Sequence, residues 1–488
     1  MMTDKESLSR YAMSPVGLPA HAFVHPLGHN REAIEAIVQT VAQSIVDYLA
    51  SAGTQVPLPS GEGTTYRSIP EQPGDLATLM EGLKAVMAGA MNPAHPGYLG
   101  HMDPLPTTVS ILGDWVAAAL NNNMLSVEMS PLLSRLEPLL MAEIAQLFGL
   151  GERAGGLLVN GGTLANLQAL TVARNVKLGC LQGGISGQAA PVILASEMAH
   201  TSIQKAAMVL GLGLEGVILV PSDQGRMDEA ALENCLGQAL AEGKQPFAVV
   251  ATAGTTVTGS IDPLPAIQRL TQAHDLWLHV DAAYGGALAF APAHRQRLAG
   301  IEGADSITFN PQKWLYVTKT CASVLFRDLG LLHSHFRIPA PYMNTEADWV
   351  NLGELSVQGT RHPDVLKLWL SLQHLGKAGC AALVDHGYHL TAAMVDQIRQ
   401  RPYLALATEP EMNLVCFRGC PPQRPAAAWD DWNVGLQRFL LAEAEVFLSL
   451  PLWQGQRWLK AVLLNPFTTV DHLAALFAQI DRYAEANA

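Results

Sequence analysis

Between residues 156 and 327 the sequence contains seven short apolar runs, and amphipathic helical stretches separate most of them. The runs are GLLVN, PVILAS, GVILVP, FAVVATA, LWLHVDAA, SITFN and SVLFR. Continuously apolar strands are typical of sheets buried on both faces, and strands that alternate with helices form parallel sheets. The pattern therefore predicts an α/β fold with a mostly parallel central sheet that helices cover on both sides.

The flanking regions have a different pattern. Residues 31–52 and 75–90 carry apolar residues at helical spacing, and a Pro- and Gly-rich connector joins them. After a helical stretch near 364–376, helices mix with strand candidates such as MNLVCFR and WLKAVLLNP. A chain of 488 residues is too long for one simple core. We expect an N-terminal helical segment over 1–95, a large domain over 96–375 and a smaller C-terminal α+β domain over 376–488.

Charge and composition narrow the choice of partners. A net charge of −13 without any basic stripe argues against a nucleic-acid partner. The polar N-terminus lacks the apolar core of a signal peptide, and no run approaches the roughly 18 apolar residues of a membrane span. The cysteines are scattered, and CFRGC has no second pair for zinc. We expect a cytoplasmic protein with reduced thiols and no metal, which binds a small metabolite and no membrane.

Chemically active side chains follow the ends of several predicted strands. VNGGTLANLQAL (159–170) leads from a strand into a helix, and its free backbone N–H groups can hold an anion. LHVDAAYGG (278–286) ends an apolar strand with Asp281, a carboxylate that needs a cationic partner or caps the next helix. His200 in SEMAHTSIQKA follows another strand, and ATAGTTVTGSIDPL (251–264) forms a hydroxyl-rich turn. Each motif taken alone also fits a purely structural role.

The stretch FNPQKWL (309–315) places Lys313 in apolar surroundings. Lysine enters such a setting when its charge is paired or chemically used, although a surface lysine on a turn is the alternative. Ligands of open α/β sheets bind at the carboxyl ends of strands. An anion cradle, a carboxylate, an imidazole and a lysine at successive strand ends suit pyridoxal 5′-phosphate. Its phosphate needs backbone donors, its ring nitrogen an acid, and its aldehyde a lysine amine.

The order of motifs HPGYLGHM, GGTLANL, SEMAHTS, TAGTT, VDAAYGG and NPQKWL resembles the group II pyridoxal-phosphate decarboxylases. That family includes aromatic amino acid, glutamate, cysteine sulfinate and diaminobutyrate decarboxylases. The resemblance runs from about residue 90 to the end of the chain. It implies fold type I (aspartate-aminotransferase-like), a homodimer with shared active sites, and α-decarboxylation of an L-amino acid to an amine and CO₂.

The resemblance also implies residue roles. Lys313 would bind the cofactor as an internal aldimine, and Asp281 would pair with the pyridine nitrogen. His200 would stack on one ring face, Ala283 would support the other, and Thr256 would lie near the ring. The phosphate would be held by Gly162, Thr163, Asn310 and Gln312.

Tyr342 in FRIPAPYMNTE (336–346) corresponds to the tyrosine of a loop that reaches the neighbouring subunit's site in this family. There it would protonate the quinonoid carbon after CO₂ leaves. Tyr342 and His200 favour simple decarboxylation over transamination or aldehyde-forming oxidative decarboxylation on the same cofactor. A cofactor-binding protein that has lost catalysis is the remaining alternative.

Two positions depart from the family pattern. Gln312 replaces the usual histidine of NPHKW, and glutamine can donate to phosphate but cannot titrate. Lys460 in WLKAVLLNP stands where the family has an arginine for the substrate α-carboxylate. Lysine supplies the charge without the bidentate fork, and Arg457 is an alternative. His101 and Asp103 in HPGYLGHMDP are the predicted side-chain contacts, suited to a polar, hydroxylated or basic substrate.

Overall fold

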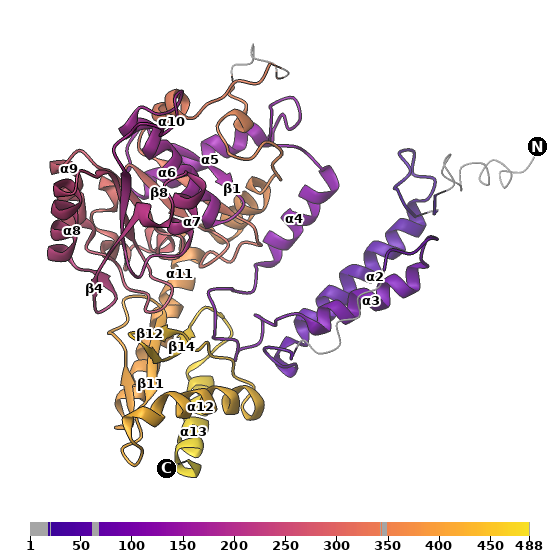
Figure 1. Cartoon of the computed structure of the whole chain (residues 1–488). Coiled ribbons are helices and arrows are strands. Elements are labelled where there is room, and N and C mark those ends of the chain that lie inside the picture. The colour runs from indigo at the N-terminus through magenta and orange to yellow at the C-terminus, as the bar shows by residue number, and fades with distance from the viewer. Residues whose placement is uncertain (1–17, 20, 61–67, 342, 344–348, 488) are drawn as a thin grey trace, which may run out of the picture. The chain divides into compact units, whose positions relative to one another are not determined.

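The computed structural model describes residues 18–19, 21–60, 68–341, 343 and 349–487. The chain divides into two compact units, Met1–Tyr98 and Leu99–Ala488. In the first, helices α2 (Arg31–Ala50) and α3 (Leu76–Gly89) lie side by side (Figure 1). Neither helix contains a buried residue. The two predicted helices are confirmed, but their apolar residues do not form a core of their own.

The second unit is built on a seven-stranded sheet of order β1-β9-β8-β7-β6-β2-β3. β9 is antiparallel to both of its neighbours, and the remaining strand pairs are parallel. The mostly parallel sheet predicted from the apolar runs is therefore confirmed. The strands are β1 (Gly155–Val159), β2 (Pro191–Ser196), β3 (Val217–Val220), β6 (Gln245–Thr252), β7 (Trp277–Asp281), β8 (Ser306–Phe309) and β9 (Ala322–Phe326).

Helices cover both faces of this sheet (Figure 1). Along β6, Val249 and Ala251 belong to the core on one face, and Ala248 and Val250 belong to the core on the other. This alternation explains why the strand is apolar at every position. One face packs against α5 (Leu133–Leu147), α8 (Glu229–Ala241) and α9 (Leu264–Ala273), and the other against α6 (Gly162–Leu178), α7 (Ser202–Val209) and α10 (Leu329–His335).

A smaller antiparallel sheet of order β10-β11-β14 forms the C-terminal part of this unit. Its apolar face packs against helices in a separate core. The elements here are β10 (Leu404–Leu406), β11 (Leu414–Gly419), α12 (Trp429–Glu443), the hairpin β12 (Leu452–Trp453) and β13 (Gln456–Arg457), β14 (Leu459–Val462) and α13 (Val470–Ala486). The remaining elements of the unit include α4 (Thr108–Leu120), α11 (Val365–Arg399) and the hairpin β4 (Ser222–Asp223) and β5 (Arg226–Met227).

Helix α11 differs from the helical stretch expected near 364–376, because it continues to Arg399. Gly376 interrupts it with φ 62° and ψ 177°, a conformation that is essentially restricted to glycine. A glycine at the end of a periodic segment resembles a helix stop, but here the helix resumes after one non-helical residue. The first half of α11 packs on the core of the large sheet, and the second half begins on that same core with Cys380 and Val384 and passes to the core of the small sheet at Leu390.

No helix in the described part of the chain is long and apolar enough to cross a membrane.

Candidate active site

The carboxyl ends of β1, β2, β6, β7 and β8 meet at one edge of the large sheet, because these strands run in the same direction. β9 runs the opposite way, so the turn that precedes it lies at this edge as well. The predicted cofactor residues follow these strand ends. They are Gly162, Thr163, His200, Thr256, Asp281, Ala283, Asn310, Gln312 and Lys313.

The N-terminus of α6 forms the first part of the site. Gly161 precedes the helix with φ 91°, a left-handed conformation that favours glycine. A Cβ atom on Gly162 would lie 2.9 Å from Asn310 Nδ2, so the glycine lets the Asn310 side chain approach the helix end. Asn310 is 3% exposed, and its Oδ1 has no hydrogen-bond partner. The Asn310 Nδ2 donor lies beside this free helix N-terminus, and together these N–H groups fit the phosphate of the cofactor.

Asp281 ends β7 and is 6% exposed. Its Oδ1 accepts a hydrogen bond from the Ala283 N–H at 3.1 Å, and its Oδ2 accepts one from Asn166 Nδ2 at 2.8 Å. These two hydrogen bonds offset part of the cost of burying this polar group. An ionised carboxylate in this position fits a protonated pyridine nitrogen.

His200 is connected to the same amide through Ser202. The Ser202 hydroxyl lies 2.9 Å from both Asn166 Nδ2 and His200 Nδ1, and the Ser202 N–H donates to His200 Nδ1 at 3.2 Å. Burial lowers the pKa of His200, although Asp281 opposes this effect. His200 is therefore a neutral imidazole near pH 7, with Nδ1 as an acceptor and the proton on Nε2.

The sequence reasoning missed Asn166, which organises this part of the site. Its Oδ1 accepts hydrogen bonds from Thr308 Oγ1 at 2.6 Å and from His279 Nε2 at 2.9 Å. Burial lowers the pKa of His279 to about 4, so this imidazole is neutral as well. Asn166 is 1% exposed and lies four residues after Gly162 on α6. A polar residue on the buried face of a helix that opens at an anion cradle was the available signal.

Lys313 lies in the turn between β8 and β9, next to the buried ring of Trp314. Burial lowers the pKa of Lys313, which Asp281 and then Asp103 partly counteract. A lowered pKa increases the fraction of neutral amine, the form that attacks a carbonyl carbon. Trp314 stacks on Tyr284 with their ring centroids 5.1 Å apart, which anchors the turn.

Gln312, the residue that departs from the family pattern, has a backbone role in this turn. Its Oε1 accepts a hydrogen bond from the Cys321 N–H at 2.5 Å, and its own N–H donates to the Cys321 carbonyl at 3.2 Å. These bonds join the lysine turn to the start of β9. The oxygen end of the Gln312 amide is thereby engaged, which leaves its NH₂ group as the donor for a ligand.

Of the two candidate cations for the substrate carboxylate, the structure brings Lys460 to the site. Lys460 is 5% exposed, and its Nζ donates to the Thr256 carbonyl at 3.1 Å. Burial lowers the pKa of Lys460. Arg457 is exposed on the hairpin of β12 and β13, where its Nη1 lies 3.5 Å from the Leu450 carbonyl.

The loop that carries His101 and Asp103 begins beside β14, where the Val462 N–H donates to the Leu99 carbonyl at 2.7 Å, and it ends at the lysine turn, where the Thr107 N–H donates to the Tyr316 carbonyl at 2.8 Å. Lys460, Asp103 and Lys319 all affect the pKa of His101. Burial is the largest of these effects and lowers that pKa. Asp103 forms an ion pair with Lys319, a residue of the turn before β9 that sequence reasoning did not single out. The Asp103 carboxylate therefore already has a cationic partner within the chain, and its predicted contact with a substrate side chain stays a prediction. Tyr342 lies outside the described residues.

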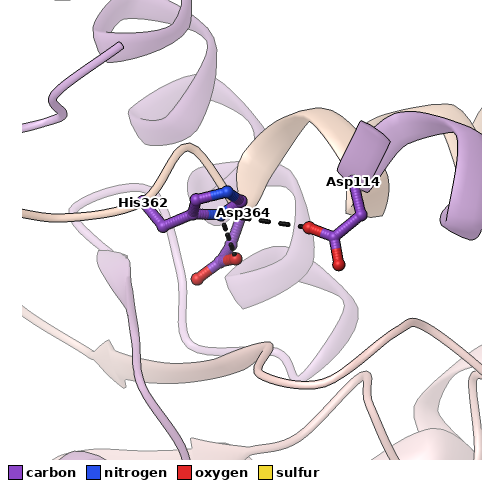
Figure 2. A group of neighbouring side chains, drawn as sticks. All are labelled: Asp114, His362 and Asp364. Carbon is purple, nitrogen blue, oxygen red and sulfur yellow. Dashed lines mark hydrogen bonds and ion pairs between the residues drawn. The ribbon is translucent and has the colours of Figure 1, made fainter. Parts of the chain in front are cut away.

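A second polar cluster lies between α4 and the start of α11, where Figure 2 shows Asp114 facing His362 and Asp364. His362 Nδ1 lies 2.9 Å from Asp364 Oδ1 and 4.0 Å from Asp114 Oδ1. The Lys367 ammonium lies 2.9 Å and 3.2 Å from the same two oxygens. Because this lysine already supplies the cation between the carboxylates, we interpret the cluster as a structural ion-pair network.

A fold of this type with a lysine, a buried carboxylate and an anion cradle at one sheet edge defines a pyridoxal-phosphate enzyme of fold type I. The chain belongs to the pyridoxal-dependent decarboxylase family, whose conserved domain matches residues 62–419. It is 30% identical to the L-2,4-diaminobutyrate decarboxylase of Acinetobacter baumannii, over 92% of this chain and 95% of that one. It is 31% identical to human cysteine sulfinic acid decarboxylase, over 86% and 85% of the two chains.

The fold is also similar to that of a solved structure. The crystal structure of mouse CSAD in apo form superimposes with a TM-score of 0.86 at 28% identity, and it covers 93% of this chain and 99% of that one. The protein is thus a pyridoxal-phosphate-dependent carboxy-lyase that removes the α-carboxyl group of an L-amino acid as CO₂.

Proposed function

We propose that the residues at the sheet edge have the binding and catalytic roles in this decarboxylation that the family resemblance implies. The observation that carries the proposal is the position of Asp281 and Lys313 at the ends of the neighbouring strands β7 and β8, where separate hydrogen bonds hold them. Pyridoxal phosphate, when bound, supplies a protonated ring that accepts the electron pair left on Cα as CO₂ departs. Asp281 would keep the ring nitrogen protonated, and Lys313 would hold the aldehyde carbon.

The phosphate would bind at the start of α6. Gly162 and Thr163 contribute backbone N–H groups there, and Asn310 and the NH₂ group of Gln312 complete the donor set. His200 would cover one face of the ring as a neutral imidazole, while Ala283 and Thr256 border the rest of it. Each of these side chains belongs to a loop at the same sheet edge.

Lys460 would bind the substrate α-carboxylate. A buried ammonium that donates only to a carbonyl gains a charged partner when a carboxylate enters. Tyr342 would return a proton to Cα after decarboxylation, acting as a general acid.

The substrate we propose is a short L-amino acid with a polar end group. Diaminobutyrate carries an ammonium at that end and cysteine sulfinic acid carries a sulfinate, so the relatives share chain length rather than charge. Asp103 and His101 are the residues we place beside this end group.

We further propose a cytoplasmic homodimer that shares its active sites between subunits. The exposed apolar residues on α2 and α3, among them Val46, Leu79 and Val86, support residues 1–95 as a dimerisation segment. The glycine break at Gly376 supports a domain boundary between 96–375 and 376–488. All the cysteines are free thiols, in keeping with a reducing compartment.

The test combines spectroscopy with a substrate panel. The purified protein should show a visible absorbance band that borohydride abolishes, and peptide mapping should then locate the reduced cofactor on Lys313. CO₂ release across a panel of L-amino acids identifies the substrate. Lys313→Ala should retain the fold and the oligomeric state but lose activity, whereas Lys244→Ala, at a surface ion pair outside the site, should remain active. Turnover by Lys313→Ala would overturn the assignment.

A further inference from the structure

The ion pair between Asp103 and Lys319 joins two loops at the rim of the active site. Asp103 belongs to the loop before α4, and Lys319 belongs to the turn between β8 and β9. Their side chains are 32% and 43% exposed. Solvent screening makes such a pair weak, so a ligand that offers an equivalent partner can replace one member at little cost.

The two members of the pair are not equivalent with respect to the site. Asp103 raises the pKa of Lys313, and this effect ranks ahead of the opposing effect of Lys319. Asp103 also opposes the lowering of the Lys460 pKa that burial causes. Asp103 is also the less exposed member of the pair, at 32% against 43% for Lys319, so the carboxylate lies on the inner side and the ammonium on the outer side.

The position of a bound amino acid follows from the proposed function, on which this inference rests. Its α-amine is directed to Lys313 and its α-carboxylate to Lys460, so its side chain extends toward the remaining wall. The Thr107 N–H donates to the Tyr316 carbonyl at 2.8 Å, so the loop that carries Asp103 lies against the turn that carries Lys313. His101 does not compete with Lys319 as a cation for Asp103, because burial has the largest effect on its pKa and lowers it.

We propose that Lys319 is a resident counter-ion for Asp103, and that the side-chain ammonium of a short diamino acid replaces it when the substrate binds. Exchange of one ammonium for another keeps the carboxylate paired. A substrate with a neutral side chain leaves the Asp103–Lys319 pair intact and gains no binding energy from it. An anionic side chain meets the inner carboxylate first and is repelled. Lys319 and Asp103 thus determine specificity for a basic end group.

The kinetic test compares L-2,4-diaminobutyrate, L-2-aminobutyrate and L-aspartate as substrates. Lys319→Met removes the competing ammonium, so KM for the diamino acid should fall about threefold to fivefold with little change in kcat. Asp103→Asn should raise that KM roughly tenfold or more and leave KM for 2-aminobutyrate nearly unchanged. The matched control is Lys244→Met, because Lys244 pairs with Glu242 away from the site.

A binding measurement tests the pair without turnover. Calorimetry on the cofactor-loaded enzyme compares 1,3-diaminopropane with n-propylamine, which lacks the second ammonium. The wild type should prefer the diamine, Lys319→Met should increase the preference, and Asp103→Asn should abolish it. Lys319→Gln serves as a second variant if the methionine protein is unstable.

The outcomes separate the two proposals. Loss of aspartate turnover in Lys319→Met, with diaminobutyrate unaffected, would show that Lys319 receives an anion and would overturn the inference. Unchanged KM values and unchanged amine preference in both variants would overturn it as well. If the wild type releases CO₂ from no L-amino acid of the wider panel, the proposed function fails, while the amine preference still decides the role of the pair.

Discussion

At the scale of single residues, the side-chain amide of Asn166 positions two of the predicted cofactor-binding residues, Asp281 and His200. Asn166 donates to both Asp281 and Ser202, and the oxygen of the same amide is held by Thr308 and His279. Because its oxygen accepts two hydrogen bonds, its NH₂ group must point at Asp281. Asn166 is thus a positioning residue, which holds the Asp281 carboxyl group in place and, through Ser202, holds His200 with Nδ1 as an acceptor.

Replacement of Asn166 should therefore affect stability and cofactor binding together. We expect Asn166→Leu to lower the free energy of unfolding by roughly 3 kcal/mol, because it leaves several buried polar groups without partners. Ser202→Ala removes a smaller part of the network and should cost about 1 kcal/mol. Urea denaturation of the cofactor-free proteins measures both values, and a cofactor titration should show weaker binding in both. Equal stability losses in the two variants would contradict this role for Asn166.

At the scale of secondary-structure elements, the break in α11 depends on one glycine. Gly376 has φ 62°, and no atom lies within 4 Å of the point that a Cβ atom would occupy, so the constraint is on the backbone and not on packing. Gly376→Ala should destabilise the protein by about 1–3 kcal/mol, because alanine rarely adopts this conformation.

The matched control is Gly237→Ala in α8, where the site is also open but φ is not positive. There alanine should stabilise the helix by about 0.5–1 kcal/mol. Thermal unfolding of both variants measures the difference. If the two substitutions have the same effect, the break at Gly376 does not constrain the backbone.

The cluster between α4 and α11 should make the stability of this contact depend on pH. The hydrogen bond to Asp364 is the largest effect on His362 and raises its pKa, while burial opposes it. Because the pKa of His362 is raised in the folded state, protonated His362 stabilises the fold fully below the ordinary histidine pKa of about 6.5. This stabilisation is lost as the pH rises through the pKa of the folded state.

His362→Gln should therefore lose more stability at about pH 5.5 than at about pH 8.5, relative to the wild type. Unfolding free energies from urea denaturation at the two pH values provide the measurement. Parallel pH profiles for the two proteins would show that His362 does not contribute through its charge.

At the scale of the whole molecule, α2 and α3 expose apolar residues, and we propose that a second copy of the chain covers them. Leu79 and Val86 are 58% and 69% exposed and lie seven residues apart, on one face of α3. If a second copy covers this face, Leu79→Asp should weaken the dimer, because a charge would be buried at the contact.

Light scattering after size exclusion should find twice the mass of 52.2 kDa for the wild type and a fraction of single chains for Leu79→Asp. Lys84→Asp, on another face of the same helix, is the control and should remain dimeric. A wild type that runs as a single chain would refute the homodimer itself.

The sequence determined the alternation of strands and helices, since continuous apolar runs are stable only when both faces of the sheet are covered. It also placed Lys313, Asp281, His200 and the α6 cradle at strand ends, because parallel strands bring their carboxyl ends to one edge. Those conclusions depend on local patterns and on a topology rule, so they needed no coordinates.

Only the tertiary structure decided which distant residues meet at that edge. Asn166 and Lys319 carry no local signal strong enough to single them out, and their roles depend on partners as far away in sequence as Asp281 and Asp103. The sequence also left open whether Lys460 or Arg457 is the cation for the substrate carboxylate. Strand pairing in the small sheet directs Lys460 to the Thr256 carbonyl and leaves Arg457 on an exposed hairpin. Hydrogen bonds and ion pairs act over a few ångströms in space, and separation along the chain does not specify which groups come that close.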